Sequence, residues 1–398
     1  MKVLVIGAGI VGVSAALTLA ERGVEVVVLE RGTVAGEASG LNAGVISGGG
    51  WGDRPDIDVA LKMGSRDRFI ELSHARGHDI GLDLTGTLTL IRTEQEWEWA
   101  MTAVAVDRQA GRQLELLTSQ ELVGLEPAAD PELLGAILDP LGARAEPVAA
   151  TEAFAAEAVS AGTVIETDCP VRALRPLAGG GWEAEAQAPR PFGADAVIIA
   201  AGPWSAEVGA MVGVEVPIVA VRGQMWASEP QPPLLRHAIG AAESSLAWSN
   251  EASSSGRPPN LTHRDDQRLT RHLYGRQRPG GEIIFGGDRV LTTDRTVDED
   301  GIAANHGHVA EVLPRIHDLS PARTWAGLMP FSLDGRPMLG PVPGHDGLFL
   351  AGGLASSGFG RGPMAGRLIS DMVMDREPEF DTTTVVPGDR VRPGRLSR

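Results

Sequence analysis

Cysteine and lysine are almost absent from this sequence. Cys169 is the only cysteine among 398 residues, which excludes an internal disulfide and a cluster of thiolate metal ligands. Lys2 and Lys62 are the only lysines, so lysine chemistry has only two candidates. The sequence also lacks an uninterrupted apolar run of membrane-spanning length, and the first expected strand begins at residue 3, leaving no room for a signal peptide. We therefore expect a soluble, cytoplasmic protein with no transmembrane segment and no metal site.

Positive charge is scarce relative to negative charge. The net charge of −17 disfavours nucleic acid as a partner, because phosphates attract basic surfaces. Hydrophobic residues make up 43% and charged residues 22% of the chain, as in an ordinary globular enzyme. A chain of 398 residues is too long for one small core, so we expect two domains.

The first thirty residues carry the most specific pattern in the chain. An apolar run at 3–6 predicts a buried parallel strand, and Gly7, Gly9 and Gly12 follow it in G-x-G-x-x-G spacing. A helical pattern, a second apolar strand at 24–29 and then Glu30 complete a β-α-β unit. A carboxylate at Glu30 suits a ribose and disfavours a 2′-phosphate, which indicates FAD or NAD rather than NADP. The alternative is an ordinary β-α-β unit that binds nothing.

Three further glycine-rich stretches follow apolar strands. Residues 31–50 form a long loop of small residues that predicts close backbone approach to a cofactor, or else a surface linker. A strand at 196–200 runs into the small-residue turn 201–205. A strand at 348–351 precedes the turn 352–362, after which we expect a helix with Pro363 in its first turn.

The remaining chain predicts a second, mixed region. Helical periodicity appears at 56–77, 97–117 and 151–161, and strand patterns appear at 82–91 and 215–228. Residues 274–288 predict a hairpin that turns at 279–281. The stretch 230–271 has no clear period and is interpreted either as a lid over a cavity or as a surface excursion.

The stretches 3–30, 37–44, 199–204 and 325–366 together resemble FAD-dependent D-amino acid oxidases and dehydrogenases, a family that includes glycine oxidase, the β subunits of sarcosine and proline dehydrogenases, and the C subunit of hydrogen cyanide synthase. The resemblance implies an α/β fold. A Rossmann-like FAD-binding domain would comprise 1–50, 140–214 and 325–398. An α+β substrate domain with a mainly antiparallel sheet would comprise 51–139 and 215–324.

The resemblance also implies FAD rather than NAD, and it assigns the residues that contact it. Val171 lies where family members hold adenine through the backbone. The full set of expected cofactor-binding residues is Gly7, Gly9, Gly12, Glu30, Arg31, Ser39, Asn42, Ala43, Gly44, Val171, Ala201, Gly202, Trp204, Gly327, Gly353, Ser356, Ser357, Gly358, Phe359 and Gly360. The loop 37–50 contains no Cys or His, so we expect FAD to be bound without a covalent link there.

The expected substrate site departs from the family pattern. Tyr274 occupies the spacing of a substrate-contacting tyrosine, but Met329 stands where relatives place an arginine that pairs with the substrate carboxylate. Ser356 stands at a second position that is basic in relatives. Either another group holds the carboxylate, with Arg276, Arg222 and Arg361 as candidates, or the substrate is not a simple α-amino acid. The expected catalytic residues are therefore Tyr274, Arg276 and Met329.

The resemblance implies oxidation of the C–N bond of a small or N-substituted amino acid, with hydride transfer to flavin N5 and hydrolysis of the imine. The electron acceptor would be oxygen, a quinone or a partner subunit. The lysine that some sarcosine oxidases use beside the flavin is missing, which favours an acceptor other than oxygen. One alternative is the catalytic subunit of a hetero-oligomeric amine dehydrogenase. Another is a flavin-binding protein without amine oxidation activity.

Overall fold

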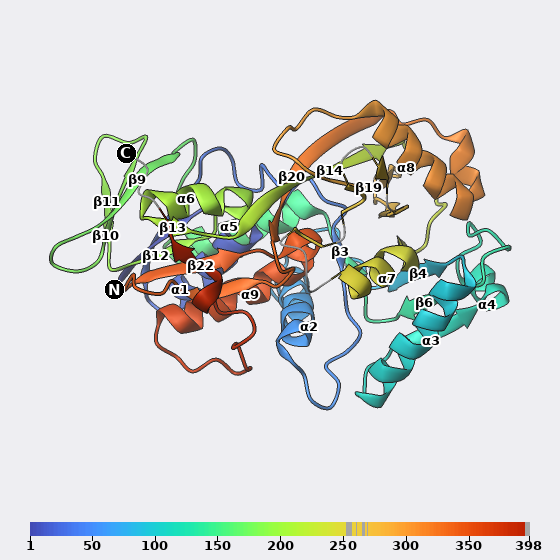
Figure 1. Ribbon diagram of the computed structural model, residues 1–398, viewed down its shortest axis with the longest axis horizontal. Coiled ribbons are helices and arrows are strands. Elements are labelled where there is room, and N and C mark those ends of the chain that lie inside the picture. Colours follow the sequence, from blue (N-terminus) through green and yellow to red (C-terminus); the bar gives the residue numbers. More distant parts are fainter. Residues whose placement is uncertain (252–256, 260, 265–266, 269, 395–398) are drawn as a thin grey trace.

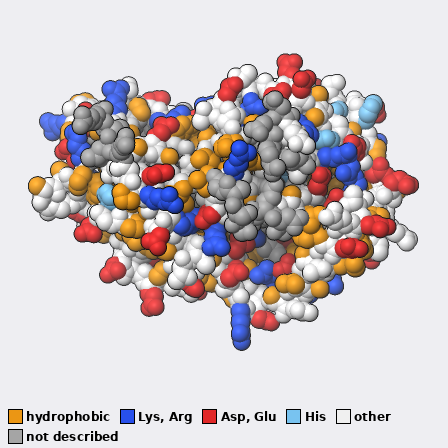
Figure 2. Space-filling model, in the orientation of Figure 1, with side chains coloured by type: hydrophobic (Ala, Val, Ile, Leu, Met, Phe, Trp, Pro, Cys, Tyr) orange, Lys and Arg blue, Asp and Glu red, His pale blue; other side chains and the backbone are white. Residues whose placement is uncertain are grey.

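The computed structural model describes residues 1–394 apart from 252–256, 260, 265–266 and 269. Two large sheets occupy the two ends of an elongated molecule (Figure 1). The first sheet has six strands and the second has eight. On the face drawn in Figure 2, acidic and basic side chains are interspersed and do not gather in one tract.

The six-stranded sheet is built from distant parts of the chain. In spatial order its strands are β21 (Met338–Pro341), β22 (Leu348–Gly352), β12 (Ala196–Ile199), β1 (Lys2–Ile6), β2 (Glu25–Leu29) and β8 (Val164–Glu166). All neighbouring pairs are parallel except β21 with β22. Its central strands are apolar on both faces because both faces are covered, as is usual for parallel strands. The predicted Rossmann-like unit is confirmed.

Helices cover one face of this sheet. The apolar side chains of α1 (Ile10–Glu21), α5 (Pro147–Ser160) and α9 (Gly358–Val373) share one core with β1 and β2, and α2 (Ile57–Ile70) packs against α9 (Figure 1). The other face carries α6 (Ser205–Met211) and a small sheet of β9 (Val171–Pro176), β10 (Trp182–Ala186) and β11 (Phe192–Ala194). The sheet is therefore a closed three-layer unit.

The eight-stranded sheet is mainly antiparallel, as predicted. Its order is β20 (Arg323–Ser332), β14 (Ile218–Ala227), β19 (Ile283–Leu291), β18 (Tyr274–Gln277), β15 (Ala238–Ala241), β4 (Thr87–Ile91), β6 (Gly135–Asp139) and β5 (Glu115–Thr118). Only β15 and β4 pair in parallel. One face packs against α8 (Glu299–Val312) and the 3₁₀ turn η3 (Pro314–Asp318). The hairpin of β18 and β19 turns at 278–281, where Gly281 has a φ of +92°.

Shorter elements complete the fold. The helix predicted at 56–77 is α2 followed by a π-helical segment, η1 (Glu71–Ala75). Two short helices are α4 (Ser119–Leu125) and α7 (Ala242–Glu251), and three 3₁₀ turns are η2 (Gly202–Trp204), η4 (Ala355–Ser357) and η5 (Gly388–Arg390). Three two-stranded sheets pair β3 (Val45–Ile46) with β7 (Ala143–Arg144), β13 (Val214–Glu215) with β23 (Arg392–Pro393), and β16 (His263–Arg264) with β17 (Gln267–Arg268).

Three predicted helices have wrong boundaries. The helix expected at 151–161 is α5, which begins four residues earlier, at Pro147. The helix expected at 97–117 is α3 (Glu94–Gln109), because Thr93 caps its start and Gly111, with a φ of +75°, ends it before strand β5. The helix α9 begins at Gly358 rather than near Pro363. Pro363 thus lies inside the helix, where it lacks an N–H group to donate, and the N–H of Met364 donates to the hydroxyl of Ser65 at 2.9 Å.

The predicted domain boundaries stay a prediction. The expected FAD-binding segment 325–398 contains most of β20, which belongs to the eight-stranded sheet. The stretch 230–271 contains β15, α7, β16 and β17, and its residues 252–256, 260, 265–266 and 269 lie outside the described residues. Among the residues that are described, no helix is both long and apolar enough to cross a membrane.

Candidate functional site

The first glycine turn brings helix α1 close to the strand edge. Gly7 has a φ of +111°, and a Cβ there would lie 2.5 Å from the carbonyl oxygen of Ala200 on the neighbouring strand. A Cβ on Gly12 would lie 2.0 Å from the carbonyl oxygen of Gly7. These positions require glycine, because a side chain on Gly7 would collide with the backbone that follows β12, and one on Gly12 would push the helix away from the turn. The geometry matches the turn and packing roles expected for them.

Glu30 is held at the rim of this turn by backbone groups. Its Oε2 accepts a hydrogen bond from the N–H of Ala8 at 2.7 Å, and its Oε1 accepts one from the N–H of Gly32 at 2.8 Å. The side chain is buried at the carboxyl end of β2. Two backbone donors therefore orient the carboxylate before any ligand binds.

The loop after Glu30 is fixed by hydrogen bonds. The side-chain amide of Asn42 donates to the carbonyl oxygens of Ala38 and Ser39 at 3.0 and 2.9 Å, and its Oδ1 accepts from the N–H of Gly44 at 2.7 Å. The Ser39 hydroxyl accepts from the N–H of Ile10 at 2.9 Å. The loop is therefore tied to the start of α1, which supports the functional interpretation of this segment over a surface linker.

A cavity of about 320 Å³ opens at the carboxyl ends of β1, β2 and β12, and we call it the first cavity. Arg31 and Trp204 both line this cavity, and the guanidinium carbon of Arg31 lies 3.6 Å from the ring centroid of Trp204, in cation–π contact. The predicted cofactor residues that line this cavity are Gly7, Gly9, Glu30, Arg31, Ser39, Asn42, Val171, Ala201, Gly202, Trp204, Gly327, Ser356, Gly358 and Phe359.

The other predicted cofactor residues are not among the residues that line the first cavity; they are Gly12, Ala43, Gly44, Gly353, Ser357 and Gly360. Three of them, Gly12, Gly44 and Gly360, are closely packed against other backbone segments. Gly44 lies against Ala145, and Gly360 lies against Val45 of β3. These positions permit the close packing that shapes the wall, which the sequence pattern alone cannot distinguish from contact with a ligand.

The eight-stranded sheet closes the far end of the first cavity. Tyr274 and Met329 both line it, together with Gly223 and Met225 of β14. The Tyr274 hydroxyl lies 3.7 Å from the sulfur of Met225. Burial raises the pKa of Tyr274, and the positive charge of Arg289 opposes that rise. The phenol is thus a hydrogen-bond donor in apolar surroundings, next to a methionine pair.

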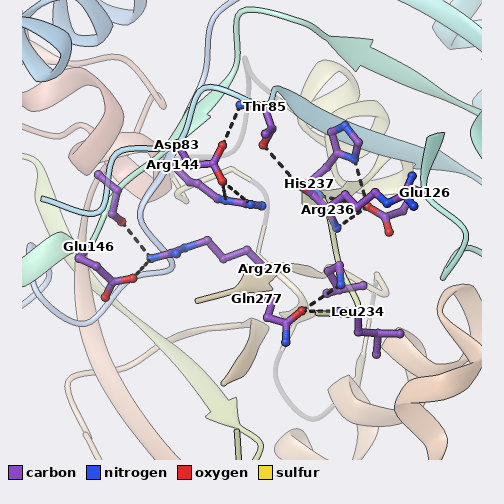
Figure 3. A network of polar contacts seen from close by, with 12 residues as sticks. Asp83, Thr85, Glu126, Arg144, Glu146, Leu234, Arg236, His237, Arg276 and Gln277 are labelled. Carbon is purple, nitrogen blue, oxygen red and sulfur yellow. Dashed lines mark hydrogen bonds and ion pairs between the residues drawn. The ribbon is translucent and has the colours of Figure 1, made fainter. Parts of the chain in front are cut away.

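The structure does not bring Arg276 to this cavity. Its Nε donates to the carbonyl oxygen of Ala43, and one terminal nitrogen donates to the carbonyl oxygen of Ala145 at 3.0 Å and to Glu146 at 2.8 Å (Figure 3). Arg276 is fully buried, and Glu146 comes from the start of α5, 130 residues away in sequence. Arg276 therefore forms a structural ion pair with Glu146, and it does not line the cavity where the predicted substrate contact would be.

The other arginines considered for a carboxylate are also engaged. Arg222 donates to the carbonyl oxygen of Thr296 at 2.9 Å and is not among the residues that line the first cavity. Arg361 pairs with Asp58 at 2.9 Å. It lines a second cavity of about 770 Å³, which adjoins the first and shares Leu354 and Ser356 with it.

Sequence reasoning missed three residues at this end: Gly223, Met225 and Arg289. The alternation of β14 places Gly223 and Met225 on one face, which the sequence pattern could have shown. Arg289 lines the second cavity, from a strand that is otherwise nearly all apolar. A charged side chain in such a strand was an available signal, since charges are seldom buried without a role or a partner.

The chain matches a known protein family over most of its length. A model of the family described as DAO, FAD dependent oxidoreductase, matches residues 2–372. The chain belongs to this family. It is 27% identical over 385 residues to a glycine oxidase from Geobacillus kaustophilus, a match that covers 95% of this chain and 94% of the relative. It is 27% identical over 441 residues to a D-amino acid dehydrogenase from Rhizobium rhizogenes, covering 96% and 98% of the two chains.

A solved structure agrees with the fold. The crystal structure of glycine oxidase from Geobacillus kaustophilus matches with a TM-score of 0.82 at 26% identity, over 100% of this chain and 99% of that one. Membership of the DAO family makes this chain an FAD-dependent oxidoreductase. The first motif alone left FAD and NAD open, and the family decides between them.

The first cavity fits the FAD of the DAO family. The glycine turn provides close backbone approach for a pyrophosphate, and Glu30 presents a preoriented carboxylate for the ribose. Val171 lies on the wall of the same cavity, where an adenine would be held. Tyr274 and Met329 lie at the other end, where the isoalloxazine ring and a substrate would meet. Among the described residues, no group of three or more His, Cys, Asp or Glu side chains could hold a metal ion.

Proposed function

We propose that this chain oxidises the C–N bond of a small or N-substituted amino acid, using FAD bound without a covalent link. Bound FAD would supply the hydride acceptor, and the imine product would hydrolyse in water. The electrons would pass to oxygen, a quinone or a partner subunit. The similarity to a glycine oxidase and to a D-amino acid dehydrogenase supports an amino acid substrate. It is compatible with oxygen as the acceptor, as in an oxidase, and with another acceptor, as in a dehydrogenase.

The observation that carries this proposal is the junction of the two sheets at the first cavity. Dinucleotide-binding groups from the six-stranded sheet and a partly buried tyrosine with two methionines from the eight-stranded sheet line one continuous space. Such an apolar end excludes water from the reacting carbon, and the tyrosine is placed to orient a polar substrate group.

Of the described residues, those at the far end of the first cavity offer the substrate a hydrogen-bond donor and no base. Tyr274 is the titratable side chain that lines the far end of the first cavity, and burial raises its pKa. A protonated phenol donates a hydrogen bond and does not act as a base near pH 7. With no base in the described part of this end of the cavity to take a proton from the substrate, the reaction requires an amine that binds in its neutral form, whose nitrogen lone pair can assist hydride loss from the adjacent carbon.

Anaerobic reduction of the purified yellow protein tests the function. A panel of glycine, sarcosine, D-proline, other D-amino acids and N-carboxymethyl amines is added without oxygen, and absorbance is followed at about 450 nm. Bleaching by one class identifies the substrate, and the rate of recolouring in air separates an oxidase from a dehydrogenase. If dithionite bleaches the protein and no amine does, the chain is a flavin-binding protein without this activity.

A further inference from the structure

Arg289 stands on the face of the eight-stranded sheet that points toward the first cavity. In the sheet register, Gly223 of β14 lies opposite Gly327 of β20 on one side and opposite Arg289 of β19 on the other. Directly opposed residues of an antiparallel sheet present their side chains to the same face. Gly223 and Gly327 line the first cavity. The arginine therefore shares a row with two glycines that line the first cavity, where Met329 packs over Gly223 and Leu41 over Gly327.

A β-bulge gives Arg289 this orientation. Gln224 pairs with Asp288 while Met225 pairs with Gly286, so Gly287 is the extra residue of β19. Without the extra residue, the two-residue period counted from Gly286 would point Asp288 toward the cavity and Arg289 away from it. Instead Asp288 faces the other side, where it accepts a hydrogen bond from Gln224 at 2.9 Å.

The bulge requires glycine at position 287. Gly287 has a φ of +155°, and a Cβ there would lie 2.0 Å from the carbonyl oxygen of His272. Only glycine fits this position, so the orientation of the next two side chains is a fixed property of the strand.

The surroundings of Arg289 connect it to the proposed substrate position. Arg289 is 4% exposed and lines the second cavity beside His272 and Ser356. Its charge reaches Tyr274 in the first cavity, where it opposes the rise in the pKa of the phenol, and it adds to the effect of burial in lowering the pKa of His272. Arg289 thus lines the second cavity, which shares residues 354–356 with the first, and its charge acts on the phenol of the first cavity.

On the basis of the proposed function, we propose that Arg289 binds the carboxylate of the amino acid substrate, in place of the arginine that Met329 replaces. A guanidinium binds a carboxylate through two parallel hydrogen bonds, and burial strengthens that pair. The carboxylate site thereby moves from β20 to β19 on the same face of the sheet, toward the second cavity. Lys62 and Arg361 also line the second cavity, but they belong to helices outside this sheet row and pair with Asp58, at 2.6 and 2.9 Å.

Ligand titration of the FAD-loaded protein tests this assignment without requiring turnover. Pyrrole-2-carboxylate and pyrrole-2-carboxamide are titrated separately, and binding is followed by the change in flavin absorbance. The wild type should bind the carboxylate more tightly than the amide. The substitution Arg289→Met should weaken carboxylate binding about 100-fold or more, because a buried partner of the charge is lost, and should change amide binding by less than about threefold.

Two further variants separate recognition from general damage. Arg289→Met combined with Met329→Arg should recover at least about tenfold of the lost carboxylate affinity, since it restores a guanidinium on the same face. Arg222→Met, which removes an arginine from the same sheet outside both cavities, should leave both affinities unchanged. If Arg289→Met prevents FAD loading, Arg289→Lys replaces it, with an expected loss of about tenfold.

Retention of the carboxylate preference in an FAD-loaded Arg289 variant would overturn the assignment, as would failure of Met329→Arg to restore it. Failure of the proposed function has a different signature. In that case no amine reduces the wild-type flavin, whatever the titrations of the Arg289 variants show.

Discussion

Glu146 is the residue on which a buried charge network depends. It lies at the start of α5 and pairs with Arg276 of β18 at 2.8 Å (Figure 3) and with Arg278, which follows that strand. Burial would raise the pKa of Glu146, but hydrogen bonds and charges from Arg278 and Arg276 outweigh it and hold that pKa below 4.5. The pair joins the loop at Ala43, next to the first cavity, to the eight-stranded sheet.

Glu146→Gln should lower the free energy of unfolding by about 3 kcal/mol at pH 7, because the fully buried Arg276 loses its counter-ion. Since the folded pKa lies below the unfolded value, this contribution is present above about pH 4.5 and is lost as the pH falls through the folded pKa. Urea unfolding at pH 7 and pH 4 measures it, and the difference between wild type and variant should shrink at pH 4.

The exposed pair of Glu185 and Arg175 provides the matched control. Their closest atoms are 3.3 Å apart, and both side chains are more than half exposed. Glu185→Gln should therefore change stability by less than about 1 kcal/mol. An equal loss from both substitutions would show that the burial of Glu146 carries no special weight.

A second prediction concerns Tyr274 and the pH dependence of flavin reduction. Because burial raises its pKa, the phenol stays protonated between pH 6 and 9, and the rate of flavin reduction should rise with pH as the substrate amine loses its proton. Tyr274→Phe should lower the rate about tenfold and leave the midpoint of this rise unchanged. Anaerobic stopped-flow measurement across this range tests it, and disappearance of the rise in the variant would assign the base role to Tyr274.

The helix–strand turn is the element that decides cofactor affinity. Gly9 precedes α1 on the cavity wall, and a Cβ there would lie 2.9 Å from the Ser39 hydroxyl. Gly9→Ala should weaken FAD binding about tenfold or more, which corresponds to about 1.4 kcal/mol, while the protein still folds because φ is −75°. Fluorescence quenching of FAD by the apoprotein measures the dissociation constant.

Gly124→Ala serves as the control for that substitution. Gly124 lies within α4, and a Cβ added there would meet no atom within 4 Å among the described residues. The alanine should leave FAD affinity unchanged and stabilise the helix by up to about 1 kcal/mol. Equal FAD affinities for the wild type, Gly9→Ala and Gly124→Ala would show that the turn at Gly9 does not contribute to FAD binding.

Elements are also the scale at which sequence reasoning succeeded or failed. Local patterns predicted the glycine turn at Gly7, the strand at 196–200 and the β18–β19 hairpin, because each depends on neighbours within a few residues. The sequence could not reveal that Glu146 pairs with Arg276, since their meeting depends on the tertiary fold. It could not orient Arg289 either, because one bulged residue reverses the face that a strand pattern implies.

The whole molecule binds its cofactor between two sheets. The first cavity takes residues such as Glu30 from the six-stranded sheet and Tyr274 from the eight-stranded sheet. FAD should therefore stabilise the entire chain against unfolding, by about 2.7 kcal/mol at a free concentration 100 times its dissociation constant. Urea unfolding of the apoprotein at graded FAD concentrations measures this linkage.

Acid precipitation tests the expected mode of attachment at the same scale. FAD held by hydrogen bonds and packing should leave the denatured chain and colour the supernatant yellow. A yellow pellet would contradict this expectation, and the linkage experiment would then show no dependence on added FAD.

The strand order of the six-stranded sheet has a consequence for synthesis on the ribosome. The strand β12 at 196–199 lies between β1 and β22, and β22 ends at Gly352. A nascent chain that has emerged only to about residue 340 has β1 and β12 paired but leaves one side of β12 without its parallel neighbour. The FAD cavity also lacks residues 351–359 at that stage. FAD therefore binds late in translation. Until then, the exposed edge of β12 is the surface that a chaperone would bind to prevent aggregation.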